Sequence, residues 1–306
     1  LSQSERGVVE NEFIRMEVDW TTGGIKSLID KKTGIDFADP TDPMGLSEFA
    51  TERHHGMSAW VIGDIKSSRM PIDGESVEQH AGPYRTTFKS TIKVAESRIV
   101  METIVRAGDP TVELNINVNW FERGTPERGV PMLRLHIPTS IETVTPRYEI
   151  PYGTITRTLT DGEEVPSQRF CDLNASDGSG VCVVNDSKYG FAVEGSSLRA
   201  TLIRSSYDPD PLPEIGEHTM RFGIRPHGAA WTPTDDVKAG AAFNQPLRVV
   251  GTNVHSGSLP PVSSWLSVKQ PNVVLAAVKR AEDGRGMILR VYETDGRDTE
   301  CTIAVD

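Results

Sequence analysis

The nine residues Val112-Glu113-Leu114-Asn115-Ile116-Asn117-Val118-Asn119-Trp120 decide the fold class of this chain. Apolar and polar side chains alternate at every position of the stretch. Successive side chains of a β-strand point to opposite faces of the sheet, so this period of two predicts a strand with one buried face and one polar face. An amphipathic helix would instead need apolar residues three and four positions apart.

The same pattern recurs along the chain. Alternation at 14–20 and 133–137 predicts two further strands, and the continuous apolar run at 181–184 is typical of a strand covered on both faces. Late strands are expected at 272–279 and 287–292. No window keeps a helical stripe free of proline and glycine, so we expect no helix. Many short strands between turn signals predict an all-β chain of antiparallel sheets packed face to face.

A change in composition near residues 232–246, which are polar and rich in turn-forming residues, divides the chain. We therefore predict a large β domain over residues 1–240 and a small C-terminal β domain over residues 241–306. The small domain is too short for a complete sandwich, and the chain still has the pattern of a strand at 302–306. It is expected either to be truncated or to pack on the larger domain.

Composition excludes several classes of protein. The chain has 306 residues, of which 37% are hydrophobic and 25% charged, as in globular proteins. A net charge of -11 disfavours nucleic acid as a partner, and no apolar run approaches the ~18 residues of a membrane span. Three cysteines without a CxxC spacing predict neither a disulfide framework nor a zinc site. Free thiols and acidity favour a cytoplasmic location.

The beginning of the chain and the missing motifs narrow the function further. The chain starts at Leu1 without an apolar signal segment, so we interpret it as a piece of a longer polypeptide, with processing from a precursor as the alternative. It contains no GxGxxG or phosphate-binding loop, no GxSxG and no HExxH. The adjacent pair His54 and His55 would point to opposite faces of a strand and is not expected to chelate a metal.

The loop from Arg204 to Glu214 is the candidate sugar-facing site. Three prolines stiffen it and would hold Asp208, Asp210 and Glu214 in place, with His218 close behind in sequence. Carboxylates beside an arginine suit hydrogen bonds to sugar hydroxyls, and a pair held ~5–9 Å apart could do acid–base work. The alternative is a rigid, solvated surface loop.

Aromatic residues offer a second kind of candidate. Tyr152 and Tyr189 lie in glycine-containing turns and could stack on a sugar face. Tryptophans are interpreted instead as core or interface residues. They are Trp60, Trp120, Trp231 and Trp265.

Several motifs occur in an order that is similar to one known family. They are Gly23-Gly24-Ile25-Lys26-Ser27-Leu28, Ile150-Pro151-Tyr152-Gly153 with Arg157, Lys188-Tyr189-Gly190, Asp208-Pro209-Asp210-Pro211, Pro226-His227-Gly228 and Leu259-Pro260-Pro261. With these motifs the sequence resembles the C-terminal region of glycoside hydrolase family 38, the α-mannosidases, of the bacterial type. The match spans nearly the whole chain.

The resemblance implies a specific architecture. Members carry an N-terminal β/α barrel with a divalent metal, usually zinc, and an Asp nucleophile. A helical bundle, a large antiparallel supersandwich similar to galactose mutarotase and a small β domain follow. By resemblance, this chain holds only the sandwich part, has no catalytic residue or metal ligand, and is inactive alone. Its partners would be the barrel of the same polypeptide and a mannose-containing glycan. Association into a homo-oligomer is a further option.

Three functional hypotheses follow. The first is the non-catalytic sandwich portion of a retaining α-mannosidase, which braces the barrel and borders its sugar cleft through the Arg204–His218 loop. The second is a standalone aldose epimerase, which needs a His acid and a Glu base. Its candidates are His136, His218 or His227 with Glu214. The third is a non-catalytic carbohydrate-binding or docking module.

Overall fold

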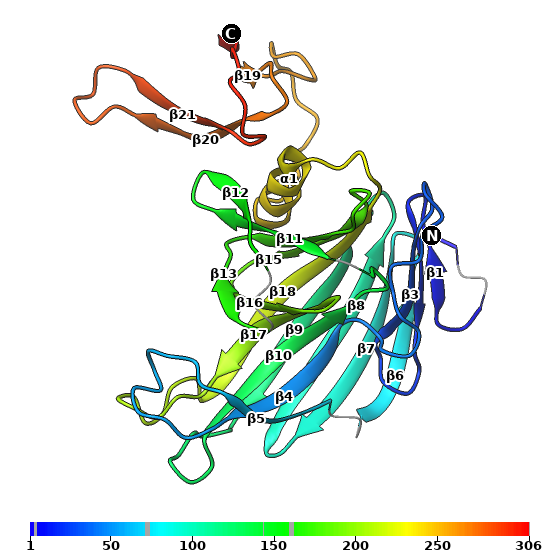
Figure 1. Ribbon diagram of the computed structural model, residues 1–306. Coiled ribbons are helices and arrows are strands. Elements are labelled where there is room, and N and C mark those ends of the chain that lie inside the picture. The colour runs from blue at the N-terminus through cyan, green and yellow to red at the C-terminus, as the bar shows by residue number, and fades with distance from the viewer. Residues whose placement is uncertain (3–4, 71–73, 143, 159–161, 306) are drawn as a thin grey trace.

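The computed structural model describes residues 1–2, 5–70, 74–142, 144–158 and 162–305. Two large antiparallel sheets pack face to face, and a small three-stranded sheet lies at one side of them (Figure 1). The predicted all-β class and the large antiparallel supersandwich followed by a smaller β part are confirmed.

The larger sheet has nine strands in the order β12-β11-β14-β15-β18-β9-β8-β7-β6. Its strands are β6 (Gly74–Ala81), β7 (Arg85–Val94), β8 (Ser97–Arg106), β9 (Val112–Trp120), β11 (Thr145–Ile150), β12 (Gly153–Thr156), β14 (Phe170–Asn174), β15 (Gly180–Asn185) and β18 (Gly216–His227). All these neighbours pair antiparallel, which lets short turns connect strands such as β7, β8 and β9.

The opposing sheet has six strands in the order β13-β16-β17-β10-β4-β5. Its strands are β4 (Leu46–Glu52), β5 (Ile65–Arg69), β10 (Val130–Pro138), β13 (Glu164–Pro166), β16 (Gly190–Glu194) and β17 (Ser197–Arg204). The side sheet consists of β1 (Val8–Glu10), β2 (Ile14–Val18) and β3 (Ile25–Asp30).

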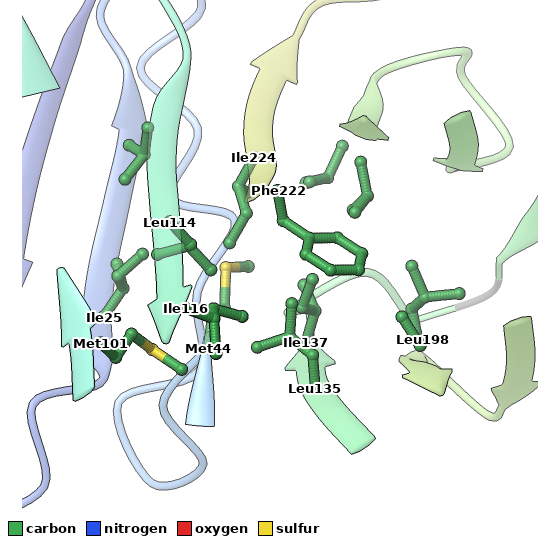
Figure 2. Packing of buried hydrophobic residues seen from close by; sticks show 14 of the residues in the cluster. Ile25, Met44, Met101, Leu114, Ile116, Leu135, Ile137, Leu198, Phe222 and Ile224 are labelled. Atoms are coloured by element: carbon green, nitrogen blue, oxygen red, sulfur yellow. The ribbon is translucent and has the colours of Figure 1, made fainter. Parts of the chain in front are cut away.

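The main core fills the space between the two large sheets. Figure 2 shows side chains of β9 and β18, among them Leu114 and Phe222, pointing toward Leu135 and Ile137 of β10. The alternation in β9 predicted this arrangement, because its apolar positions are fully buried while Asn117 and Asn119 face solvent. The strictly alternating segment therefore supplies one wall of the core.

A helix, α1 (Pro233–Asn244), covers the outer face of the nine-stranded sheet over β14 and β15. The expectation that the chain has no helix was wrong at this segment. Few apolar side chains join the helix to the sheet: Val237 packs with Phe170 and Val184 in a second, small core. The missed signal was a helix start, with Pro233 in the first turn and the Asp235 carboxylate accepting a hydrogen bond from the backbone N–H of Thr232.

The C-terminal part follows a long connection, residues 246–265, and consists of two strand pairs. These are β19 (Leu266–Val268) with β22 (Ile303–Val305), and β20 (Val273–Arg280) with β21 (Met287–Glu293). Val274 and Tyr292 of the β20–β21 hairpin pack against the small core under α1. The predicted boundary at residue 240 falls within α1, and the division into two domains stays a prediction.

In the described part of the chain, no helix has the length and apolar character needed to cross a membrane. Helix α1 has 12 residues and packs on β14 and β15.

Removing a core side chain tests the packing between the sheets. Leu114 is fully buried, so Leu114→Ala leaves a cavity and should lower the free energy of unfolding by about 2–5 kcal/mol. Urea unfolding followed by circular dichroism measures the change. Val249→Ala is the control, because Val249 is 93% exposed and should change stability little. Equal effects of the two substitutions would contradict this core assignment.

Candidate functional site

Arg204 ends β17 and fixes the loop that connects β4 to β5. Its Nη2 donates to Oε2 of Glu52 at 2.8 Å, and its Nε donates to the other carboxylate oxygen. Its remaining donors bind the carbonyl oxygens of Ser58 at 2.6 Å and of Val61 at 2.7 Å. A guanidinium in this bidentate geometry is held firmly, so Arg204 ties the loop to the sheet.

Glu52 is the buried partner in this arrangement. Its side chain is fully buried, yet Arg204, His55 and the backbone N–H of Gly63 all contact its carboxylate. The distances are 3.1 Å from His55 Nε2 and 2.7 Å from Gly63 N. A buried carboxylate persists only when its oxygens are hydrogen-bonded and its charge is paired, and both conditions hold here.

Asp208 joins the candidate loop to the same neighbouring loop. Its Oδ2 accepts a hydrogen bond from the backbone N–H of Met57 at 3.0 Å, and its carbonyl accepts one from Ala59 at 2.8 Å. The hydroxyl of Ser58 is buried and accepts hydrogen bonds from the backbone N–H groups of Tyr207 and Asp208. Residues 53–63 and 205–214 therefore form one fixed pair of loops at one end of the sandwich (Figure 1).

The other predicted site residues make local contacts. Asp210 Oδ1 accepts from the backbone N–H of Leu212, and His218 Nε2 lies 2.6 Å from the carbonyl oxygen of Glu214. Among the described residues, no hydrogen bond or ion pair joins Asp208, Asp210 and Glu214 to one another. His218 also lines a hollow of about 310 Å³ on the nine-stranded sheet. Their place in a sugar cleft stays a prediction.

Apolar side chains gather at the tips of the paired loops. Met57, Val61 and Leu212 are each 57% exposed, and Trp60 is 71% exposed. Trp60 is therefore not a core residue, whereas Trp120 is fully buried and donates to the Ser205 hydroxyl at 2.7 Å. A rigid loop pair with an apolar tip is suited to contact with another protein surface.

A second cluster, which sequence reasoning missed, lies under α1. Arg147 of β11 donates to Asp172 of β14 at 2.8 Å and to Asp236 of α1 at 2.6 Å. Asp172 also faces His227 Nε2 at 2.9 Å, and the Trp231 indole donates to Asp236 at 2.6 Å. Of these residues, His227 stood in the motif Pro226-His227-Gly228, and Trp231 was interpreted as a core or interface residue. The other three residues come from distant segments and become neighbours only through the fold.

The two buried carboxyls in this cluster titrate differently. Burial and the negative charge of Asp172 raise the pKa of Asp236 to about 8. Burial alone would also raise the pKa of Asp172, but the hydrogen bond from His227 and the charges of His227 and Arg147 outweigh it and hold that pKa below its usual value. The arginine therefore faces one ionised and one largely protonated carboxyl near neutral pH.

Three groups in this cluster have metal-ligand chemistry. Ligand atoms of Asp172, Cys182 and Asp236 lie within 4.8 Å of one another. Burial raises the pKa of the Cys182 thiol well above its usual range, so the thiol stays protonated and is a poor ligand. The Arg147 guanidinium already contacts both carboxylates. These residues therefore fit an internal ion pair better than a metal site.

The histidines proposed for the epimerase hypothesis do not form one site. His136 lies on β10, where its Nε2 is 2.9 Å from an Asp42 carboxylate oxygen. His218 and His227 lie near opposite ends of β18, and His227 is buried against Asp172. His218 comes nearest to an acid–base pair, with its Nδ1 3.9 Å from Glu214 Oε2.

The fold defines this part of the chain as a two-sheet antiparallel β-sandwich with one helix on its outer face. Residues 9–212 match the family model described as glycosyl hydrolases family 38 C-terminal domain. Residues 272–306 match the model of the glycosyl hydrolases family 38 C-terminal beta sandwich domain. The chain therefore belongs to glycosyl hydrolase family 38, as its C-terminal region.

Curated relatives are larger α-mannosidases. The chain is 31% identical over 260 residues to alpha-mannosidase 2C1 of Homo sapiens, and this alignment covers 79% of the chain and 24% of that protein. It is 26% identical over 309 residues to alpha-mannosidase G of Dictyostelium discoideum, in an alignment that covers 95% of the chain and 28% of that protein. The chain thus spans about a quarter of the length of these relatives.

A solved structure confirms the fold. An alpha-mannosidase from Enterococcus faecalis V583 superposes on 100% of this chain with a TM-score of 0.80 at 18% sequence identity, and the match covers 38% of that protein. At this identity the likeness shows the fold alone.

The buried Arg204–Glu52 pair generates one prediction. Glu52→Gln removes the charge that compensates Arg204 and should destabilise the protein by about 3 kcal/mol, measured by urea unfolding. Limited proteolysis should then cut first within residues 53–63, the loop that the pair holds. Asp210→Asn is the control, since Asp210 makes only a local turn contact. Unchanged protease resistance of Glu52→Gln would contradict the proposed restraint.

Asp236 generates a prediction on pH. Its carboxyl binds a proton up to about pH 8 in the folded protein but only near its ordinary pKa of 3.8 when unfolded. This proton contributes its full stability at pH values below the pKa that Asp236 has in the unfolded protein. The contribution is lost as the pH rises toward the pKa that Asp236 has in the folded protein. Asp236→Asn cannot titrate at this position, so it removes the contribution of this carboxyl to the pH dependence.

Urea unfolding at about pH 5 and about pH 8 checks this sign. Relative to Asp236→Asn, the wild type should be less stable at the higher pH than at the lower one. A stability difference that stays constant between the two pH values would show that Asp236 does not titrate in this range.

Proposed function

We propose that this chain is the non-catalytic β-sandwich portion of a retaining α-mannosidase-like glycoside hydrolase. It braces a catalytic barrel of the same polypeptide and borders the sugar-binding cleft of that barrel. Membership in glycosyl hydrolase family 38 and the α-mannosidase names of its relatives support the substrate class.

The connection between α1 and β19 carries this proposal. It contains six aliphatic side chains that the rest of the chain leaves almost entirely uncovered. Their exposed fractions are 96% for Leu247, 93% for Val249, 84% for Val250, 105% for Val254, 86% for Leu259 and 89% for Val262. Single exposed aliphatic residues are ordinary, but a cluster within one short segment is typical of a surface that another structure covers.

The backbone of this connection is also unpaired. Residues 246–265 are all described, and none of their backbone groups is hydrogen-bonded to a backbone group of another described residue. A segment with no internal support and many apolar side chains gains order only by lying on another surface. Full burial of one such side chain contributes about 1.5–3 kcal/mol, so a partner would be held by several of them.

The paired loops at the other end of the sandwich offer a second contact. Their apolar tip and the carboxylate of Asp208, which is held by the Met57 N–H, suit a position at the rim of a sugar cleft, where a rigid border excludes water and orients hydroxyl groups. The nucleophile and a divalent metal, of which zinc is our expectation, belong to the barrel. We also propose that the enzyme acts in the cytoplasm on mannose-containing glycans.

Activity of separate and joined parts tests the proposal. The chain alone should not hydrolyse p-nitrophenyl α-D-mannopyranoside with or without added Zn²⁺, whereas the longer polypeptide with its upstream region should. Turnover by the isolated chain would contradict the non-catalytic role. Mutarotation of glucose or galactose by the isolated chain would instead favour the epimerase hypothesis.

A double substitution tests the bracing contact separately. In the longer polypeptide, replacing both Val249 and Val250 with serine should lower the melting temperature and the retained activity, because the covering surface loses two apolar contacts. Val305→Ser, at a residue 58% exposed in β22, is the matched control. Equal behaviour of the two variants would exclude the connection as a contact surface.

A further inference from the structure

A cavity of about 280 Å³ lies where four segments of the chain meet. Its walls come from the end of β11 with the turn that leads to β12, from Gln168 and Arg169 just before β14, from the C-terminal end of α1 and from the β20–β21 hairpin. In Figure 1, β11, β12, α1 and the hairpin lie together near the end of the sandwich that carries the hairpin. Binding sites for small molecules occur preferentially at such junctions between domains.

Two tyrosines form an aromatic corner in this cavity. The rings of Tyr152 and Tyr292 meet edge to face, 5.7 Å apart and at 77°. Arg290 donates to the Tyr152 hydroxyl at 2.8 Å and lies over its ring at 5.6 Å from the centroid. Tyr152 nevertheless stays 55% exposed, so its ring is held in a fixed orientation and still offers apolar surface.

The backbone at Tyr152 is unusual as well. Its φ of 63° lies in the left-handed region, which a bulky L-residue rarely adopts. Glycine or asparagine would occupy this turn position with less strain. A strained residue with an exposed aromatic ring suggests that the side chain has a use at this position.

Polar groups complete the cavity. Glu149 is buried, and the backbone N–H and side chain of Arg169 donate to its carboxylate, which fixes the back wall. Arg169 also interacts with the Tyr292 hydroxyl. Gln168 and Gln245 are among the residues that line the cavity, and neither side-chain amide is hydrogen-bonded to another described residue of the chain. Each amide can donate and accept hydrogen bonds.

We propose that this cavity binds one pyranose ring of a mannose-containing glycan. The apolar face of the ring packs on Tyr152, and its hydroxyls exchange hydrogen bonds with Gln168 and Gln245. The volume falls just below the range of about 300–1,000 Å³ for small-molecule sites, which suits a single sugar ring. The choice of mannose as the sugar rests on the proposed function.

Calorimetric and NMR titration of the chain with methyl α-D-mannopyranoside tests this site. The wild type should bind saturably, and Tyr152→Ala should weaken binding at least about fivefold, about 1 kcal/mol, because the stacking surface is lost. Tyr152→Phe keeps the ring and should bind within about twofold of the wild type. Tyr189→Ala is the matched control, since Tyr189 is 57% exposed and does not line the cavity.

Several results would overturn the proposal. The first is the absence of saturable binding of methyl α-D-mannopyranoside to the wild type. The second is an equal loss of affinity in Tyr152→Ala and Tyr189→Ala. The third is binding of methyl β-D-galactopyranoside to the wild type with the same affinity as the mannoside. If Tyr152→Ala does not fold, the double variant Gln168→Ala with Gln245→Ala decides, and unchanged binding would reject the site. An active longer polypeptide without sugar binding by this chain would reject this site alone, leaving the bracing role intact.

Discussion

The nine-stranded sheet is buried on both of its faces where β14, β15 and β18 lie side by side, and the rest of the molecule depends on this double burial. Its inner face packs on the six-stranded sheet, and its outer face packs under α1. Every residue of β15 is buried for this reason. Gly223 on β18 shows how close the outer contact is, since a Cβ there would lie 2.7 Å from a Val184 methyl group and 3.2 Å from the Phe243 ring.

This central layer positions the polar features around it. The outer face carries the cluster of Arg147, Asp172 and Asp236, in which Arg147 pairs with the charge of Asp172 and donates a hydrogen bond to Asp236 of α1. The helix in turn supports the β20–β21 hairpin through Val274 and Tyr292. The C-terminal part is thus linked to the sandwich by packing, and the cavity with Tyr152 and Tyr292 forms at that contact.

Much of the fold could be predicted from residue patterns, because a period of two is a local property. The alternation at 112–120 and the apolar run at 181–184 became β9 and β15, with the burial that each pattern implied. Helix α1 was missed because its buried residues are few and small, such as Ala239 and Gly240. Tertiary contact and a favourable first turn stabilise it more than an apolar stripe does.

The candidate site was predictable only in part. The stiffness of the Asp208–Glu214 loop can be inferred from its prolines, but its partner, the loop at 53–63, cannot, because 150 positions separate Ser58 from Asp208. Likewise, Arg204 was recognised as a functional candidate, while its buried partner Glu52 carries no local signal. Long-range pairs of this kind exist only once both sheets have formed.

We propose that this sandwich serves a reaction centre outside its own residues and that another surface covers the connection at 246–265. Hydrogen–deuterium exchange of the amides in this connection tests the claim most directly. The account predicts fast exchange in the chain alone and strong protection in the longer polypeptide, because the unpaired backbone would then lie on the barrel. Equally fast exchange in both forms would contradict it.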